Sequence, residues 1–330
     1  MKPNNGRTMN TKSSQGLSLI ELLVSITLGL IIVGGLTHSY STTKTNYQLN
    51  TALTTMHSEA HYALNHIISE TQQAGFLGET IHYTLIQGTS PPVAANGTCK
   101  TNNKWARMIE QPVYGLNDNV KLSSTINYTG CISKKDYLRG DIITLRSASQ
   151  QIISADQAKK KPNKDRLYLL SSPEKGLIFQ GQDLDKNSLA SPLQSLRELQ
   201  ASAYYIGPAI GGDNNTCKDN QQPYSSLFRE TLNSKGKPQR QEISQGIENI
   251  QIQFGIDSNG DKTINNYVDS TSSIQWDQVI AVRVWILARA SCPEAGFKNT
   301  KTYILGDQKI TPSDQYQRLL LSTTIPLVYR

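Results

Sequence analysis

Histidine is absent from most of this sequence. The chain has 330 residues, and its five histidines all lie at or before His82. A Ser-His-Asp or Cys-His hydrolase and a His-ligated catalytic zinc each need an imidazole, so residues 83–330 are excluded from holding such a site. His57 and His61 are four residues apart and could share a metal, but two solvated helix residues are the favoured interpretation. We predict that the protein is not an enzyme.

Charge is also scarce. Charged residues form 18% of the chain and hydrophobic residues 37%, against typical values of about 25% and about 45–50%. This composition argues against a coiled-coil rod and a polytopic transporter. Part of the net charge of +7 comes from Lys2, Arg7 and Lys12, in a first segment without an acid. The basic clusters at 159–161 and 235–240 are interpreted as solvated loops, so nucleic acid is not expected as a partner.

A long apolar run follows the basic first segment. Between Lys12 and Lys44 the only charged residue is Glu21. As a helix, residues 17–36 would cover roughly 30 Å, the thickness of a bilayer core. Because the basic residues precede the run, we expect a single membrane pass with the amino terminus in the cytoplasm.

Glu21 is an unusual residue for a membrane span, since a carboxylate there is unfavourable unless it is neutralised. If the chain is cut after Gly16, the new α-amino group of Leu17 begins the helix and Glu21 lies one turn further along. A cation and an anion would then lie at the same depth. They could pair within one chain or between neighbouring chains.

The junction Gly16-Leu17-Ser18-Leu19-Ile20-Glu21-Leu22-Leu23 resembles the class III leader junction of type IV prepilins and pseudopilins. The resemblance implies that prepilin peptidase cuts between Gly16 and Leu17 and methylates the amine of Leu17. It also implies that Glu21 is needed for assembly, through a pair with a neighbour's terminal amine. Leu17 departs from the family, whose usual first mature residue is Phe. Met9 is an alternative start that would give an eight-residue leader.

The helical pattern continues beyond the apolar run. Residues 17–90 contain no proline, and Gly75 and Gly78 are natural helix stops. In assembled pili of the resembling family a stretch near Gly34-Gly35 becomes extended, and we expect the same here. An apolar stripe at spacings of three and four predicts that the second half of this helix docks on a globular head. The stripe contains Leu53, Met56, Ala60, Ala63, Ile67 and Ala74, with Leu64 and Ile68 beside it.

From about residue 79 the apolar period changes to two, which indicates half-buried strands. The clearest runs are 141–146, 166–171, 250–256 and 282–287, and Arg139-Gly140-Asp141 is interpreted as a turn before the first. The predicted fold is α+β and pilin-like, with a long N-terminal helix packed on an antiparallel β-rich head. The predicted domains are a cleaved leader (1–16), a transmembrane helix (17–36), an amphipathic stalk helix (37–78) and the head (79–330).

All four cysteines lie in the predicted head, and none has the CxxC spacing of zinc or thioredoxin-like sites. An even count in an exported domain predicts two disulfides, with three connectivities open. We favour Cys99–Cys131, which closes the shorter loop, and Cys217–Cys292.

One head segment has the composition of a calcium loop. Calcium takes six to eight oxygen ligands, often from alternating side chains in a tight turn. Lys262 stands where such loops prefer glycine. Counted from Asp257, the twelfth position, which is an acid in such loops, is Val268 here, and Asp269 follows one residue later. An Asp/Asn/Gly hairpin turn is the alternative, and calcium is the only candidate cofactor. The candidate ligands are Asp257, Asn259, Asp261, Thr263, Asn265 and Asp269.

Scattered head segments are similar to PilW-type minor pilins: Tyr62-Ala63-Leu64, Ala74-Gly75-Phe76, 246–251, 254–257, 279–283 and 323–327. This resemblance implies a low-abundance subunit that primes or caps a type IV pilus. Its implied partners are other minor pilins, the major pilin, prepilin peptidase and the inner-membrane assembly platform. The implied location is the inner membrane with the head in the periplasm, and then the surface pilus. A minor pseudopilin of a type II secretion system and a pilus-tip adhesin or DNA-uptake receptor remain alternatives.

Overall fold

The computed structural model describes residues 18–94, 104–118, 131–154, 156–157, 163–184, 194–210, 224–270 and 274–329. Its contacts divide the chain into two compact units, which meet between Thr51 and Ala52. Helix α1 (Leu19–Gln73) contributes to both, so each part of the helix is described with its own unit. The predicted long helix is confirmed.

The first unit is a single stretch of helix with an apolar surface. Large hydrophobic side chains from Leu19 to Leu36 are between 50% and 76% exposed. Within the residues that the structure describes, α1 alone is long and apolar enough to cross a membrane. The helix continues through Gly34 and Gly35, which have no neighbouring atom within 4 Å of an added Cβ. The expected extension there concerns the assembled fibre and stays a prediction.

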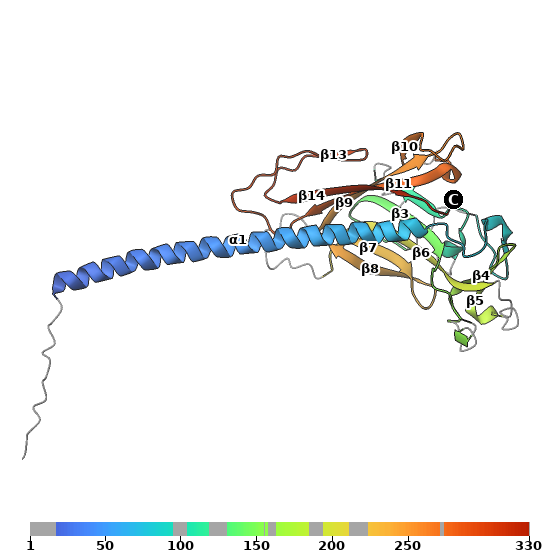
Figure 1. Cartoon of the computed structure of the whole chain (residues 1–330), viewed down its shortest axis with the longest axis horizontal. Coiled ribbons are helices and arrows are strands. Elements are labelled where there is room, and N and C mark those ends of the chain that lie inside the picture. Colours follow the sequence, from blue (N-terminus) through green and yellow to red (C-terminus); the bar gives the residue numbers. More distant parts are fainter. Residues whose placement is uncertain are drawn as a thin grey trace, which may run out of the picture. The chain divides into compact units, whose positions relative to one another are not determined.

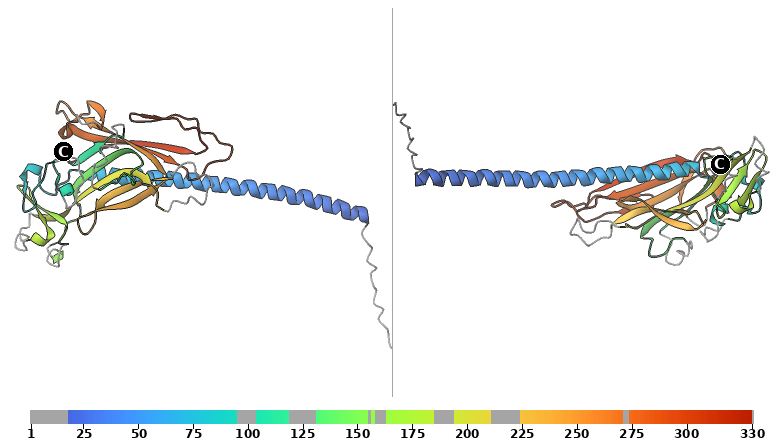
Figure 2. Two further views of the ribbon diagram at one scale, coloured as in Figure 1. Left: turned by 180° about the vertical axis from the view of Figure 1, so that it is seen from behind. Right: turned by 90° about the horizontal axis from the view of Figure 1, so that it is seen from below.

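The second unit begins with the remaining turns of α1, which lie along the strands of the head in both views of Figure 2. The predicted apolar stripe is the buried face of these turns. Ala60, Ala63 and Ile67 are fully buried, and Leu53 and Ile68 pack partly against the same core. Because alanine has a small side chain, the helix approaches the strands closely at Ala60 and Ala63.

The strands form two main antiparallel sheets and a small hairpin (Figure 1). The larger sheet has the order β1-β5-β4-β6-β3-β2, with β7 paired to β6 and β8 to β7, and only β1–β5 is parallel among the described pairs. The smaller has the order β10-β9-β11-β14, and β12 pairs with β13. The strands of the larger sheet are β1 (Ile86–Gln87), β2 (Val113–Leu116), β3 (Arg139–Ala148), β4 (Leu167–Ser171), β5 (Gly176–Gln180), β6 (Ser195–Pro208), β7 (Ser225–Leu232) and β8 (Pro238–Gln245). The others are β9 (Ile247–Ile256), β10 (Asn266–Asp269), β11 (Val279–Arg289), β12 (Tyr303–Leu305), β13 (Gln308–Ile310) and β14 (Arg318–Pro326).

The central strands of the smaller sheet follow the predicted alternation. Ile252 of β9 lies opposite Val284 of β11, and Phe254 lies opposite Val282. These four side chains are buried in the core that also receives α1. The α+β fold, with a long helix on an antiparallel β-rich head, is therefore confirmed.

Two sequence interpretations were wrong. Arg139-Gly140-Asp141 is the start of β3 and not a turn before it. Asp141 is only 1% exposed, and its carboxylate accepts hydrogen bonds from the backbone N–H groups of Asp118 and Ile252 at 3.1 and 2.8 Å. Burial raises the pKa of Asp141 well above its ordinary value. The solvated-loop interpretation of residues 235–240 is wrong only for the end of the cluster: Arg240 lies on β8 and forms an ion pair with Asp136 at 2.7 Å, whereas Lys235 and Lys237 are exposed in the turn before β8.

Two glycines end α1 and turn the chain into the head, as predicted. Gly75 and Gly78 have positive φ values of 85° and 69°, a region that favours glycine. A Cβ on Gly78 would lie 2.2 Å from Ser171 Oγ. That hydroxyl donates to Glu79 at 2.7 Å, so the glycine permits a polar contact between this turn and β4.

We predict that Gly78→Ala destabilises the head by about 1–3 kcal/mol, since it combines backbone strain with a steric clash. Thermal unfolding of the purified chain in mild detergent measures the effect. Gly296→Ala is the matched control, because Gly296 has a φ of 82° and open space around its Cβ position. Equal losses in the two variants would contradict the clash with Ser171.

Candidate functional site

The exposed apolar helix carries one acidic side chain in its first turns. Glu21 is the acid of the first turn of α1, and its backbone carbonyl accepts a bond from Ser25 Oγ at 2.7 Å. Within the part of the chain that the structure describes, no ion pair or hydrogen bond reaches its carboxylate. Gly16 and Leu17 lie outside the described residues, so cleavage between them stays a prediction.

Polar contacts fix the other half of α1 to the head. Ser244 of β8 donates its hydroxyl to the backbone carbonyl and the carboxylate of Glu59, at 2.9 and 2.7 Å. One turn before the helix ends, Glu70 pairs with Arg229 of β7 and accepts a hydrogen bond from Ser202 of β6 at 2.6 Å. These bonds set the position of the helix along the strands, which apolar packing alone would not specify.

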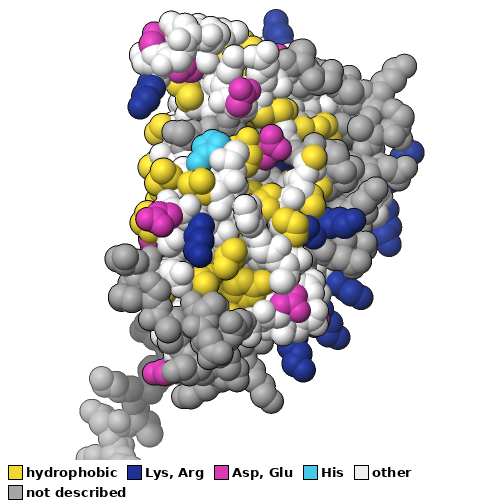
Figure 3. Space-filling view, turned by 90° about the vertical axis from the view of Figure 1, so that its right-hand side faces the viewer, with side chains coloured by type: hydrophobic (Ala, Val, Ile, Leu, Met, Phe, Trp, Pro, Cys, Tyr) yellow, Lys and Arg dark blue, Asp and Glu magenta, His cyan; other side chains and the backbone are white. Residues whose placement is uncertain are grey.

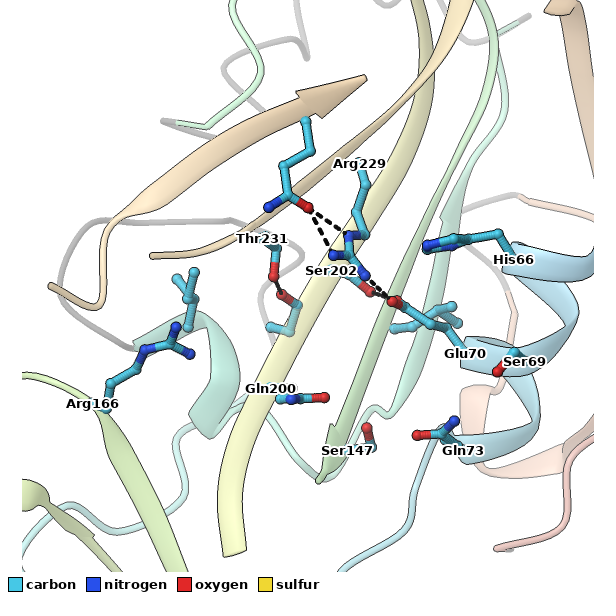
Figure 4. A pocket seen from close by; sticks show the side chains of 14 residues that line it. His66, Ser69, Glu70, Gln73, Ser147, Arg166, Gln200, Ser202, Arg229 and Thr231 are labelled. Carbon is cyan, nitrogen blue, oxygen red and sulfur yellow. Dashed lines mark hydrogen bonds and ion pairs between the residues drawn. The ribbon is translucent and has the colours of Figure 1, made fainter. Parts of the chain in front are cut away.

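The Glu70–Arg229 pair lies at a polar cavity of about 400 Å³ between α1 and the larger sheet (Figure 4). Figure 4 shows Glu70 and His66 projecting from the helix towards Arg229 and Ser202. Gln241 also holds the guanidinium, because its Oε1 accepts from Arg229 Nη2 at 2.7 Å. Arg229 is therefore held from both sides.

His66 completes this cluster. Its Nδ1 lies 2.8 Å from the hydroxyl of Tyr204, a buried residue of β6. Burial lowers the pKa of His66, with the nearby Glu70 acting in the opposite direction. The neutral imidazole is thus favoured in the folded head. His57 and His61 are exposed, and no group of three or more metal-binding acidic, His or Cys side chains occurs among the described residues.

Sequence reasoning missed these polar contacts. Glu70 and Arg229 are 159 residues apart, and neither belongs to a local motif. The helical spacing of His66 and Glu70 was the only signal, and it places them on one face without identifying a partner.

The predicted calcium loop is a tight turn between β9 and β10. The Asp257 carboxylate accepts from the backbone N–H groups of Gly260 and Lys262 at 2.7 and 2.8 Å. Asp261 accepts from the N–H of Thr263 at 2.8 Å, and hydrogen bonds from Thr263 and Asn259 lower the pKa of Asp261. The turn therefore brings Asp257, Asn259 and Asp261 together without an ion.

The structure shows where the two residues that depart from the calcium-loop pattern, Lys262 and Asp269, lie. Lys262 has a φ of 63°, the only positive value for a non-glycine residue in the described ranges. Asp269 lies on β10 opposite Gln253, and its carboxylate accepts a bond from Gln253 Nε2 at 2.7 Å. Asn265 Oδ1 accepts from the N–H of Ser258 at 2.7 Å. Calcium binding stays a prediction.

Cys131 and Cys292 each take part in a disulfide bond. Cys99 and Cys217, their predicted partners, lie outside the described residues. The favoured pairing of Cys99 with Cys131 and of Cys217 with Cys292 therefore stays a prediction.

Two family comparisons match this chain. The type IV pilus-assembly protein W family matches residues 203–328, from β6 to the residues after β14. The prokaryotic N-terminal methylation motif matches residues 11–37, which include Gly16, Leu17 and Glu21. No curated protein and no solved structure gave a significant match.

We predict that Glu70→Ala loosens the end of α1, because it leaves the half-buried Arg229 guanidinium without its acid. The expected loss of stability is about 1–3 kcal/mol, and hydrogen exchange should speed up within residues 60–73. Glu198→Ala is the matched control, since its pair with Arg166 has the same side-chain exposures of 25% and 23% but involves no helix residue. Unchanged helix exchange in Glu70→Ala would contradict the anchoring role.

Calorimetry at millimolar calcium tests the candidate loop against the hairpin-turn alternative, since a calcium site would bind through the oxygens around Asp257. Asp257→Ala should abolish the signal, whereas Glu174→Ala in an exposed turn should not alter it. Absence of a signal from the unaltered chain would reject the site.

Proposed function

We propose that this chain, a pilin related to the type IV pilus-assembly protein W family, is a minor pilin that primes or caps a type IV pilus. The leader would be removed between Gly16 and Leu17 by prepilin peptidase, with methylation of Leu17. The subunit would then enter the fibre through Glu21 and the apolar half of α1. On this proposal the protein has a structural role and no catalytic one.

One observation carries the proposal: Glu21 lies on an exposed apolar helix, and nothing in the described residues neutralises it. A carboxylate at the centre of a membrane helix costs about 2.5–3.5 kcal/mol on insertion scales, which is an upper bound for Glu21 in the first turn of α1. The terminal amine of a neighbouring processed pilin would offset this by supplying a positive charge in the same apolar layer. Assembly would then satisfy a group that the lone subunit leaves unpaired.

The same sequence features support the proposed orientation. Basic residues before the apolar run favour an amino terminus in the cytoplasm, with the head in the periplasm before assembly. The proposed partners are the major pilin, other minor pilins and the inner-membrane assembly platform. The description of the matched family favours a type IV pilus over a type II secretion pseudopilus.

We predict that Glu21→Gln gives a processed, membrane-resident protein that fails to support piliation. The substitution keeps the size of the side chain and removes the charge that the neighbouring amine would meet. Electron microscopy counts the fibres, and intact-mass analysis checks that the mature chain begins at methylated Leu17.

Ser25→Ala is the control, since it alters a side chain of the same helix that bonds only to the backbone of its own turn among the described residues. It should leave fibre number unchanged. Normal fibre numbers with Glu21→Gln, or a mature terminus elsewhere, would contradict the proposed mechanism.

A further inference from the structure

The head has a groove at the end where α1 stops and the chain terminates. Its walls come from the turns after α1, from the segment before β2, from the 3-10 turn before β11 and from the last residues of the chain. The groove encloses about 860 Å³. Figure 3 shows this end of the head, where hydrophobic side chains form several patches among polar and charged ones. None of these residues belongs to the apolar helix or to the cavity beside Glu70.

The groove has several exposed apolar and aromatic side chains on its walls. Ile81, Val328 and Tyr329 are 82%, 62% and 40% exposed and all line it. Phe76 packs on Tyr329 with ring centroids 4.9 Å apart. Exposed apolar and aromatic side chains that share one concave surface are typical of interaction sites.

Another wall of the groove contains Trp276, whose position is fixed by packing against neighbouring aromatic rings. The Trp276 ring packs on Tyr114 and Phe254, with centroids 4.9 and 5.0 Å away. The segment before β2 is held by Arg146, which is 1% exposed and donates to the carbonyls of Trp105 and Gln111 at 2.9 and 2.5 Å. The groove is therefore already formed in the free head, which lowers the entropy that a ligand must give up on binding.

The charges of the groove have one sign. Among the described residues that line it, the ionisable side chains include three acids, Glu79, Glu110 and Asp277, and no Lys or Arg. Arg197 forms an ion pair with Glu79 at 3.3 Å, so that acid is compensated. Within the described ranges, Glu110 accepts a hydrogen bond from the Tyr83 hydroxyl at 3.4 Å and has no ion pair, and Asp277 is exposed beside Trp276. In this part of the structure, two carboxylates without an ion pair thus flank aromatic and aliphatic surface.

We propose that this groove binds a basic, partly apolar segment of another protein. A Lys or Arg side chain would place its charge near Glu110 and Asp277 and lay its aliphatic stem on the aromatic walls. Neighbouring apolar residues of the segment would cover Ile81 and Val328. If the proposed function is correct, this other protein is a different pilin subunit; that identification rests on the proposed function.

The test measures binding of the purified full chain, in mild detergent, to each minor pilin of the same pilus system. The double variant Glu110→Lys/Asp277→Lys should bind one of these pilins about tenfold or more weakly. Binding by the unaltered chain should also weaken as salt is added. Glu174→Lys/Asp165→Lys makes the same change in net charge away from the groove and should bind normally. A Lys→Glu or Arg→Glu variant of the partner should restore binding to the double variant.

Three results would overturn the groove proposal: equal binding by both double variants, binding only to a second copy of this chain, and no binding of any pilin by the unaltered chain. Circular dichroism checks that the variants fold. If Glu21→Gln abolishes fibres while the groove variant binds its partner and assembles normally, the groove proposal is rejected and the proposed function is retained. Fibre formation by Glu21→Gln would reject the proposed function, whatever the groove binds.

Discussion

The two halves of helix α1 have different surroundings, and the rest of the structure depends on this difference. From Leu19 to Leu36 its large hydrophobic side chains are exposed all round, whereas from Met56 to Ile67 an alanine-rich stripe is buried against two sheets. Apolar surface that is left uncovered is stable only in lipid or against other apolar helices. The single carboxylate of Glu21 lies on this apolar surface and is unfavourable in lipid unless it is neutralised. The N-terminal methylation motif, which matches residues 11–37, supports membrane anchoring and pilus association.

The head serves this helix by holding its second half in register. Apolar packing supplies most of the contact, but Ala and Ile side chains could slide along the strands. Glu59 and Glu70 prevent this through bonds to strands β6, β7 and β8. Gly75 and Gly78 then turn the chain back into the larger sheet, and the last residues of the chain pack beside that turn. The end of the helix and the end of the chain therefore build one surface.

Local patterns predicted the elements and not their partners. The spacing of Ala60, Ala63 and Ile67 predicted the buried helix face, and alternation along β9 and β11 predicted two central strands. Positions 139–141 were misread because a Gly between charged residues resembles a turn. In the structure Gly140 lies on β3 of the larger sheet and is packed closely against Asn249 and Ile250 of β9 in the smaller sheet. The Glu70–Arg229 pair and the terminal groove could not be predicted, since their residues come from distant parts of the sequence that only the fold brings together. The N-terminal methylation motif could be predicted because its residues are local, contained in a few successive positions, and the family match over residues 11–37 agrees with it.

The central claim is that the first turns of α1 contact another pilin in the assembled fibre. A photoreactive amino acid at Leu22, next to Glu21, tests this directly in sheared and purified fibres. The account predicts a cross-linked product that joins this chain to the N-terminal helix of another pilin, identified by mass spectrometry. Fibres that contain this chain but give no cross-link to another pilin would contradict it.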